Sequence, residues 1–367
     1  MTAALTPPTL QTLPDAIAEN VVRARSRTRA RLMAVVKADA YGHGAAPVAR
    51  AAVAAGAAWL GTTDLGDAVA LRAAGLRTPI LTWLNPSGID AEASAAHGID
   101  LAVGSVDELE ALLRQRAPAA VRVHLHVDAG MAREGCPERE WETLIEQARA
   151  AHADGRIEVR GLMGHLPSAD RGDAATNAPA VARMRRAQAA VVRAGFGPLL
   201  AHLAATSGTL TDPATHLDMV RVGAGLVGID PSGRTALTGA SRLTAPVVHS
   251  RAVAAGTAIG YDGSHVTAEE TNLSVLPLGY ADGIPREISR DAFVEIEGLS
   301  HRIVGRVSMD QIVVDTGPRR YARGTTATIF GPGGGTAPTI HDWARWSGSI
   351  AHTIVTGIGA RVRRSNA

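Results

Sequence analysis

Lys37 is the residue whose position in the sequence most strongly suggests covalent chemistry. It ends an apolar run and directly precedes a glycine-rich turn, in the stretch AVVKADAYGHG at residues 34–44. An ammonium group in apolar surroundings either finds a charged partner or loses its proton. A deprotonated lysine can attack a carbonyl carbon and form a Schiff base. Lys37 is therefore a candidate Schiff-base residue; the alternative is a lysine that reaches from a strand end into water.

Other apolar runs along the chain also end in polar residues with complementary chemistry. These residues are His126, Asp128, Arg133, His165, Thr206, Ser207 and Arg221. Hydroxyl and backbone N–H groups suit a phosphate, and an arginine can hydrogen-bond a ring nitrogen. Together with a Schiff-base lysine, these groups are the ones needed to bind pyridoxal 5'-phosphate (PLP). Each residue also has a structural explanation, such as helix capping by Thr206 or an ion pair of Arg221.

The elements that must position these residues are eight short apolar runs, separated by mostly alanine-rich segments. The runs span residues 31–37, 59–63, 79–84, 100–104, 121–127, 157–166, 199–206 and 219–229. Most intervening segments are long enough for a helix and end in glycine or proline. Eight strand–helix units predict a closed (β/α)8 barrel, with its active site at the carboxyl ends of the strands. An open doubly wound sheet is the alternative fold.

The sequence changes character near residue 236. Valine- and threonine-rich runs separated by turn residues follow, with one helical segment, TIHDWARWSG, at residues 339–348. Such runs predict strands rather than helices. We therefore predict two domains, a PLP-binding barrel over residues 1–235 and a mainly β domain over residues 236–367.

Composition and charge argue against several classes of protein. The formal net charge is +2 and the arginines are scattered, so nucleic-acid binding is not expected. The single cysteine, Cys136, allows no intrachain disulfide and no cysteine-based metal cluster, and no metal is expected. No apolar run reaches the roughly 20 residues of a membrane helix, and the N-terminus lacks a signal-peptide pattern. These features predict a soluble cytoplasmic protein without a membrane partner.

Six stretches of the chain resemble blocks of the PLP-dependent alanine racemase family, in the family's order. They are AVVKADAYGHG, DAGMAREG, MGHLPSAD, LDMVRVGAGLVGI, GYADG and GRVSMDQ. The resemblance runs from about Arg31 to the C-terminus and implies a (β/α)8 barrel followed by a β domain. It implies that Lys37 forms the Schiff base and is one of two proton-transfer groups. It also implies that Arg221 faces the pyridine nitrogen without protonating it, since arginine is a poor acid, and this favours racemisation over transamination.

The second proton-transfer group that the resemblance implies is Tyr261, in AIGYDGSH. Inversion of an α-carbon needs one base on each face, and in the family this tyrosine reaches the barrel of a second copy in a head-to-tail homodimer. A phenol needs nearby positive charge or hydrogen bonds to act as a base near neutral pH, and His165 with Arg221 can supply them. The structural alternative is a loop tyrosine packed against the β domain.

The remaining site residues also come from the resemblance. The further cofactor-binding residues are Tyr41, His165, Thr206, Ser207, Gly223 and Ala224. Arg133 and the backbone of Met309 are implied to bind the substrate carboxylate, and Tyr280 to line the entrance. Asp170 and Arg306 are implied to form a polar pair further out.

Two positions near the cofactor and the substrate depart from the family pattern. Ala205 and Thr206 replace an Asn-Ser pair at the phosphate, which keeps a hydroxyl but removes an amide. His126 replaces a position that often holds a carboxylated lysine. The negative charge beside Arg133 must then come from Asp128 or from a bound anion.

Further departures lie toward the two ends of the chain. Asp262 follows Tyr261 in place of glycine, and a nearby carboxylate disfavours a phenolate. The family has a C-terminal tyrosine at the pocket mouth, whereas no tyrosine follows Tyr321, so we expect a wider pocket. The N-terminal segment TPPTLQTLPDAIAENV is expected to lack the family's opening strand.

The resemblance implies an isomerase that interconverts L- and D-alanine, a cell-wall precursor, by two-base proton transfer. A paralogue acting on serine or a larger amino acid is the alternative. A decarboxylase on the same barrel type commonly uses a cysteine in its β domain, and a zinc-assisted dehydratase needs a Cys/His pair near the C-terminus; Cys136 is in neither place. A catalytically impaired PLP-binding protein is the non-enzymatic alternative, and the presence of Lys37 and Tyr261 argues against it.

Overall fold

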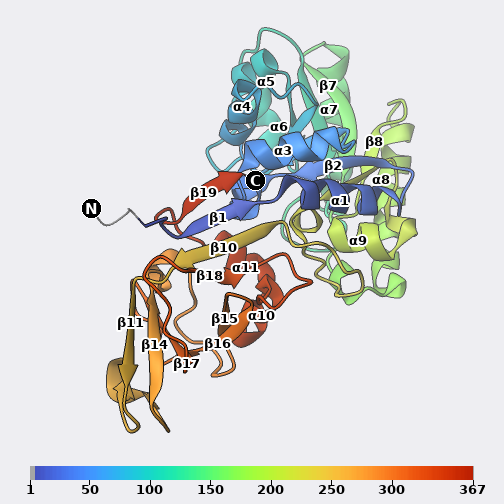
Figure 1. The fold of residues 1–367 in the computed structure, drawn as a ribbon. Coiled ribbons are helices and arrows are strands. Elements are labelled where there is room, and N and C mark those ends of the chain that lie inside the picture. Colours follow the sequence, from blue (N-terminus) through green and yellow to red (C-terminus); the bar gives the residue numbers. More distant parts are fainter. Residues whose placement is uncertain (1–4, 367) are drawn as a thin grey trace.

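The chain folds into a closed barrel and a mainly β part, as the computed structural model of the protein shows for residues 5–366 (Figure 1). The barrel strands are β2 (Arg31–Val35), β3 (Trp59–Thr62), β4 (Ile80–Thr82), β5 (Ile99–Val103), β6 (Val121–His126), β7 (Ile157–Met163), β8 (Leu200–His202) and β9 (Met219–Val222). All neighbours are parallel, and β2 pairs with β9 to close the barrel. The predicted (β/α)8 barrel is confirmed, and the open sheet is wrong.

Every predicted barrel strand is present, but most are shorter than predicted, β8 and β9 most of all. The apolar run at 219–229 leaves the strand at Val222 and continues as a short 3-10 turn, Ala224–Val227. The run at 199–206 gives β8 and then starts α9 (Thr206–Thr211). Apolar character continues past the strand ends because these turns are buried as well, so periodicity alone does not locate the end.

Helices cover the outside of the barrel. They are α1 (Pro14–Arg25), α3 (Ala45–Ala54), α4 (Leu65–Ala73), α5 (Ala91–His97), α6 (Val106–Leu113), α7 (Trp141–Ala153) and α8 (Ala174–Arg193). Several begin with a side-chain cap: Asp64 accepts from Gly66 N, and Ser105 accepts from Glu108 N. Such caps satisfy N–H groups that the first helical turn leaves free.

The barrel interior is filled by large side chains that alternate along the strands. One cluster consists of Met33, Val35, Trp59, Leu81, Trp83, Ala102, Met163 and Met219. Gly61 on β3 leaves the space for it, because a Cβ there would lie 2.7 Å from the Met33 sulfur and 2.9 Å from the Trp83 ring. The interior of the barrel is therefore close-packed rather than an open channel.

The second part is a nine-stranded sheet with the strand order β11-β14-β17-β16-β15-β18-β10-β1-β19. Its strands are β1 (Thr9–Thr12), β10 (Ser241–Pro246), β11 (His249–Val253), β14 (Thr271–Leu276), β15 (Phe293–Ile296), β16 (Leu299–Val304), β17 (Ile312–Gly317), β18 (Thr326–Phe330) and β19 (Arg363–Asn366). A small β12 (Ala258–Ile259) and β13 (His265–Val266) hairpin projects from it. The helices α10 (Ile340–Trp346) and α11 (Ala351–Thr356) pack between this sheet and the barrel (Figure 1).

Two expectations for the ends of the chain are wrong. The opening strand is present as β1, which pairs with β10 and β19 and buries Leu10. Prolines on both sides of this four-residue strand hide it in the sequence, since Pro8 precedes it and Pro14 starts α1. The β part also holds a second helix, α11, beyond the one predicted. No helix among residues 5–366 has the length and apolar character that crossing a membrane requires.

Candidate active site

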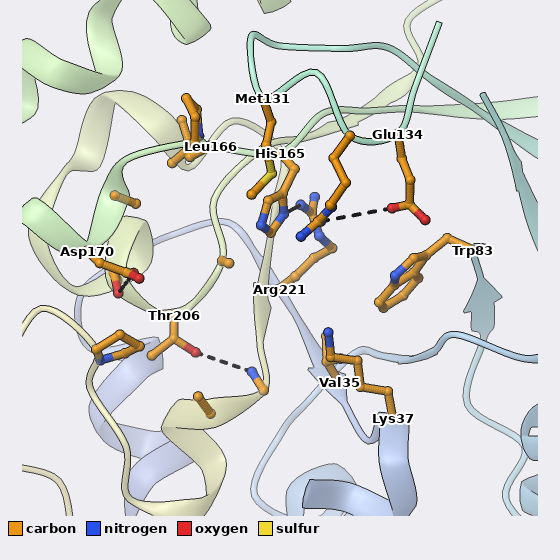
Figure 2. Close-up of a pocket in the computed structure, with 18 of the residues that line it drawn as sticks. Val35, Lys37, Trp83, Met131, Glu134, His165, Leu166, Asp170, Thr206 and Arg221 are labelled. Atoms are coloured by element: carbon orange, nitrogen blue, oxygen red, sulfur yellow. Dashed lines mark hydrogen bonds and ion pairs between the residues drawn. The ribbon is translucent and has the colours of Figure 1, made fainter. Parts of the chain in front are cut away.

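A cavity of about 310 Å³ opens at the carboxyl ends of the barrel strands. It collects ten of the residues singled out in the sequence, namely Lys37, Tyr41, His126, Arg133, His165, Thr206, Ser207, Arg221, Gly223 and Ala224. It is also lined by residues that the sequence did not reveal, including Trp83, Met131, Glu134 and His352. Figure 2 shows Lys37, His165, Thr206 and Arg221 around one space. The volume is in the range of small-ligand pockets, about 300–1,000 Å³.

Lys37 is held at the end of β2 by an unusual turn. The four residues after it, 38–41, have left-handed backbone angles, with φ between 51° and 57°, and none of them is glycine. This conformation costs roughly 1 kcal/mol or more per residue, so the surroundings must fix it. Burial lowers the pKa of Lys37, and the charges of Arg133 and Arg221 lower it further, whereas Glu134 acts in the opposite direction. A neutral amine is therefore more accessible here than on the surface.

One side of the cavity presents hydroxyl and backbone N–H donors. Thr206 Oγ1 accepts from the backbone N–H groups of Gly223 (3.3 Å) and Gly225 (3.1 Å), which ties α9 to the turn after β9. A Cβ on Gly223 would lie 2.3 Å from the Tyr41 hydroxyl, so only glycine allows this phenol to enter. Burial raises the pKa of Tyr41 to about 12, and the phenol therefore stays protonated and can donate. This donor set matches an anionic group such as a phosphate.

The opposite side of the cavity is organised by Arg221 on β9. Its Nη2 donates to the carbonyl oxygens of Gly164 (2.7 Å) and Leu203 (3.2 Å) and to His165 Nδ1 (3.1 Å). Burial lowers the pKa of Arg221 to about 10, so it remains a cation at neutral pH. Arginine offers five N–H donors, so groups remain that can face the cavity.

His126 and His165 contribute no positive charge. Burial and the charge of Arg221 lower the pKa of His126 to about 4 and that of His165 to about 3. Of the two contributions expected from His165 and Arg221 toward a phenol, positive charge or hydrogen bonds, a neutral His165 can offer only a hydrogen bond. Arg221 and Arg133 are the cations that remain beside Lys37.

Arg133 lies on a tight loop between β6 and α7. Asp128 Oδ1 accepts from the backbone N–H groups of Gly130 (2.8 Å), Met131 (2.9 Å) and Ala132 (3.1 Å). Asp128 is therefore used to shape the loop and is not the support for Arg133 that the sequence suggested. Arg133 instead forms an ion pair with Glu134 at 3.9 Å (Figure 2). The lining of the cavity itself thus supplies the negative charge.

The C-terminal segment reaches the same cavity through α11. This helix packs against the turn after Lys37 so closely that a Cβ on Gly42 would lie 2.6 Å from the Val355 carbonyl oxygen. His352 lies beside Tyr41, with 6.0 Å between the ring centroids. An aromatic ring from the C-terminal segment therefore does line the cavity, although no tyrosine is present there. A helix of six residues is too short to show a periodic apolar pattern in the sequence.

Three of the predicted site residues lie elsewhere. Tyr261, Tyr280 and Met309 belong to the β part, do not line the cavity, and are 62%, 38% and 52% exposed. Within one chain, the structure therefore does not bring them to Lys37.

The expected polar pair of Asp170 and Arg306 is not formed within one chain. Arg306 forms an ion pair with Asp262, the residue after Tyr261. Asp170 lines the cavity and accepts from Ser207 Oγ (2.8 Å). The Asp262 carboxylate is thus partly neutralised, and Ser207 is oriented by a neighbour that the sequence could not reveal.

Comparison with known proteins agrees with this fold and site. The family model "Alanine racemase, N-terminal domain" matches residues 14–231, and "Alanine racemase, C-terminal domain" matches residues 240–366. Curated alanine racemases from Beutenbergia cavernae and Salinispora tropica are 44% and 41% identical, covering 95% and 94% of this chain and the same shares of those proteins. The chain belongs to the alanine racemase family.

Solved structures of the family superpose on nearly the whole chain. The alanine racemase from D-cycloserine-producing Streptomyces lavendulae is 38% identical, with a TM-score of 0.94 over 100% of this chain and 98% of that one. The enzyme from Bartonella henselae, solved with covalently bound pyridoxal phosphate, is 26% identical, with a TM-score of 0.85 over 99% of this chain and 100% of that one.

Proposed function

We propose that this protein interconverts L- and D-alanine with pyridoxal 5'-phosphate as cofactor, using Lys37 and Tyr261 as the two bases. The observation that carries the proposal is the single cavity that joins Lys37, whose pKa is lowered, to a set of phosphate-type donors and to Arg221. Membership of the alanine racemase family supports the same activity. The enzyme is an isomerase.

The residues present fit the cofactor. The hydroxyls of Tyr41 and Thr206 and the backbone N–H groups of Ser207 and Ala224 offer the donors that a phosphate needs, and the amine of Lys37 can bond the aldehyde carbon. The Ser207 hydroxyl and the Gly223 N–H already donate to Asp170 and Thr206, respectively. Arg221 would hydrogen-bond the ring nitrogen as a donor and, as a poor acid, would leave it unprotonated. When bound, the cofactor withdraws electrons from the α-carbon of an attached amino acid, so that its α-proton can be removed.

Proton transfer then needs one group on each face of the α-carbon. The neutral amine of Lys37 takes or returns the proton on one face, and the lowered pKa of this lysine favours that role. The Tyr261 hydroxyl of a second copy serves the other face. Arg133 binds the substrate carboxylate together with the backbone of Met309 from that copy, and Tyr280 lines the entrance.

The active form in this proposal is a head-to-tail homodimer in the cytoplasm. The exposure of Tyr261, Tyr280 and Met309 supports it, because exposed aromatic and thioether side chains are typical of interfaces. In this arrangement the barrel, strands β2 to β9, binds the cofactor, and the β part reaches the other copy. A pair of such contacts related by a twofold axis completes two sites at once.

The test is exchange of the α-proton in deuterated water, followed by NMR on PLP-loaded protein. L-Alanine and L-serine are compared, and each product is analysed for its D-enantiomer. We expect rapid exchange and D-alanine formation with alanine as the preferred substrate. Inversion of serine alone would mean a different substrate, and exchange with neither would overturn the proposal.

A further inference from the structure

A line of buried polar side chains crosses the barrel interior below the cavity. Arg221 Nη1 donates to His202 Nδ1 (2.8 Å), and His202 Nε2 lies 2.9 Å from His124 Nδ1. His124 Nε2 lies 3.5 Å from Asp100 Oδ2. These four residues come from β9, β8, β6 and β5, and all are buried. The line begins at the cavity and leads away from it through the barrel core.

The line ends in a carboxylate at the opposite side of the barrel. Asp100 pairs with Arg122 Nε (3.0 Å) and with Arg160 Nη1 (3.8 Å), and both arginines are partly exposed. A buried carboxylate is costly without compensating charges, so these arginines stabilise the Asp100 anion. Arg122 and His124 are two residues apart on β6, so their side chains lie on the same face of the strand, the one that faces the barrel interior.

The shape of the barrel leaves the His124 ring little freedom. A Cβ on Gly161 of β7 would lie 2.1 Å from His124 Nδ1, so a glycine is required beside the ring. The Trp59 ring packs edge-on at 5.5 Å between centroids, and the His202 ring does so at 5.2 Å. The position of His124 is therefore fixed by packing as well as by polar contacts.

The donors and acceptors in this line allow one arrangement of protons. Arginine only donates, so His202 Nδ1 must accept. Burial and the charge of Arg221 lower the pKa of His202 well below its usual range, so its imidazole is neutral and carries its proton on Nε2. That proton points to His124 Nδ1, which leaves the His124 proton on Nε2. This N–H faces the Asp100 carboxylate at 3.5 Å, an electrostatic contact rather than a hydrogen bond. Every N–H in the line therefore points away from Arg221 and toward Asp100.

We propose that His124 and Asp100 are positioning residues for Arg221. They fix His202 as the Nε2–H tautomer, which keeps His202 Nδ1 as an acceptor and holds the guanidinium in one orientation at the cavity. The carbonyl oxygens of Gly164 and Leu203 hold its other end. The inference rests on the proposed contact between Arg221 and the cofactor ring. It extends the site by two residues that do not line the cavity.

The test combines imidazole NMR with kinetics on His124→Leu and His124→Gln. Proton–nitrogen correlations of protein labelled with nitrogen-15 in histidine and arginine distinguish the two tautomers of His202 and report whether the Arg221 N–H groups exchange slowly. In His124→Leu we expect the pure Nε2–H signal of His202 to be lost, the Arg221 protons to exchange faster, and kcat to fall about tenfold. In His124→Gln, whose amide can accept and donate, we expect most of the signal and the rate to be retained.

Leu125→Ala is the matched control, because Leu125 is the next residue on β6 and is buried but not part of the line. It should lower stability while leaving the His202 tautomer and kcat unchanged. Asp100→Asn, which keeps the size of the side chain, serves if His124→Leu does not fold, and should shift the same signals with a severalfold loss of kcat.

Unchanged His202 and Arg221 signals in the folded His124→Leu or Asp100→Asn protein would overturn the inference. A fall in kcat no greater than in Leu125→Ala would overturn it as well. The tautomer measurement is made on cofactor-free as well as PLP-loaded protein and does not depend on turnover. Failure of the proposed activity is therefore distinguishable from failure of this inference.

Discussion

The barrel mouth and the exposed edge of the β part differ in how complete they are within one chain. At the barrel mouth, Lys37 is half-buried, and Arg221 and Thr206 are buried and hydrogen-bonded to neighbouring strands and turns. At the β edge, Tyr261 and Met309 are more than half exposed and do not line the cavity. The barrel mouth is a preformed cavity, whereas the β edge is an exposed surface that carries residues predicted to belong to the site.

This difference separates cofactor binding from proton transfer. In the proposed mechanism, a single chain has the groups to bind and polarise the cofactor, but it has a base on only one face of the α-carbon. Substitutions at the barrel mouth should therefore impair binding and catalysis together, whereas substitutions at the β edge should impair catalysis alone.

The largest effect is expected from Lys37→Ala. Without the amine, the cofactor loses its covalent attachment and the substrate loses one base, so racemisation should fall by more than about 10⁴-fold. Borohydride reduction followed by peptide mass analysis should attach the cofactor to Lys37 in the unmodified protein and to no residue of the variant. Because Lys37 is the only lysine in the sequence, attachment at the N-terminal amine instead of Lys37, or cofactor still fixed by borohydride in the variant, would show that the site is assigned wrongly.

Tyr261→Phe should distinguish the role of the β edge in catalysis from the role of the barrel mouth in cofactor binding. Removal of the hydroxyl should lower racemisation by about 10²- to 10⁴-fold, the usual contribution of a general base, while the affinity for PLP stays unchanged. The cofactor affinity, measured by titration of the visible absorbance, is the internal control. Loss of PLP affinity together with activity would show that Tyr261 helps to bind the cofactor, and it would contradict the separation of roles between the barrel mouth and the β edge.

Glu134→Gln should have a smaller effect, confined to the barrel mouth. Glu134 pairs with the partly exposed Arg133, and such pairs contribute at most about 1 kcal/mol, so KM for alanine should rise about three- to fivefold with little change in kcat. Glu138→Gln is the control, because Glu138 pairs with Arg186 outside the cavity. An equal change in both variants would mean that Glu134 has no special role.

A further effect concerns stability against pH rather than activity. Burial lowers the pKa of His126 to about 4, so between about pH 6.5 and 4 the unfolded chain binds a proton that the folded chain does not. The free energy of unfolding should therefore decrease as the pH falls through this window, by up to about 1.4 kcal/mol per pH unit for this residue. Chemical denaturation of His126→Gln should show a shallower decrease, and identical slopes would contradict the assignment.

The sequence predicted the barrel and much of its mouth because both rest on local patterns. Apolar runs of strand length locate β2 to β9, and the polar residues at their ends meet at one rim by the geometry of parallel strands. The strand β1 was missed because its four residues lie between prolines. Strand ends were placed too late where buried turns prolong the apolar run.

The contacts that the sequence did not predict join residues that are far apart in the chain. Ser207 meets Asp170, and Arg306 pairs with Asp262, through loop conformations that have no periodic signal. The alternation in VRVHLHV, at residues 121–127, does indicate that His124 shares a face with His126. It does not show that His202 on β8 contacts His124, because that contact spans the intervening strand β7 and needs Gly161 there to leave room for the ring.

The most direct test of the central claim is complementation between Lys37→Ala and Tyr261→Phe. The two variants, carrying different purification tags, are produced together, and the mixed dimer is isolated by both tags. If each site takes Lys37 from one copy and Tyr261 from the other, the mixed dimer has one intact site and should show about half the activity of the unmodified dimer. Activity no higher than that of either parent variant would contradict a shared site.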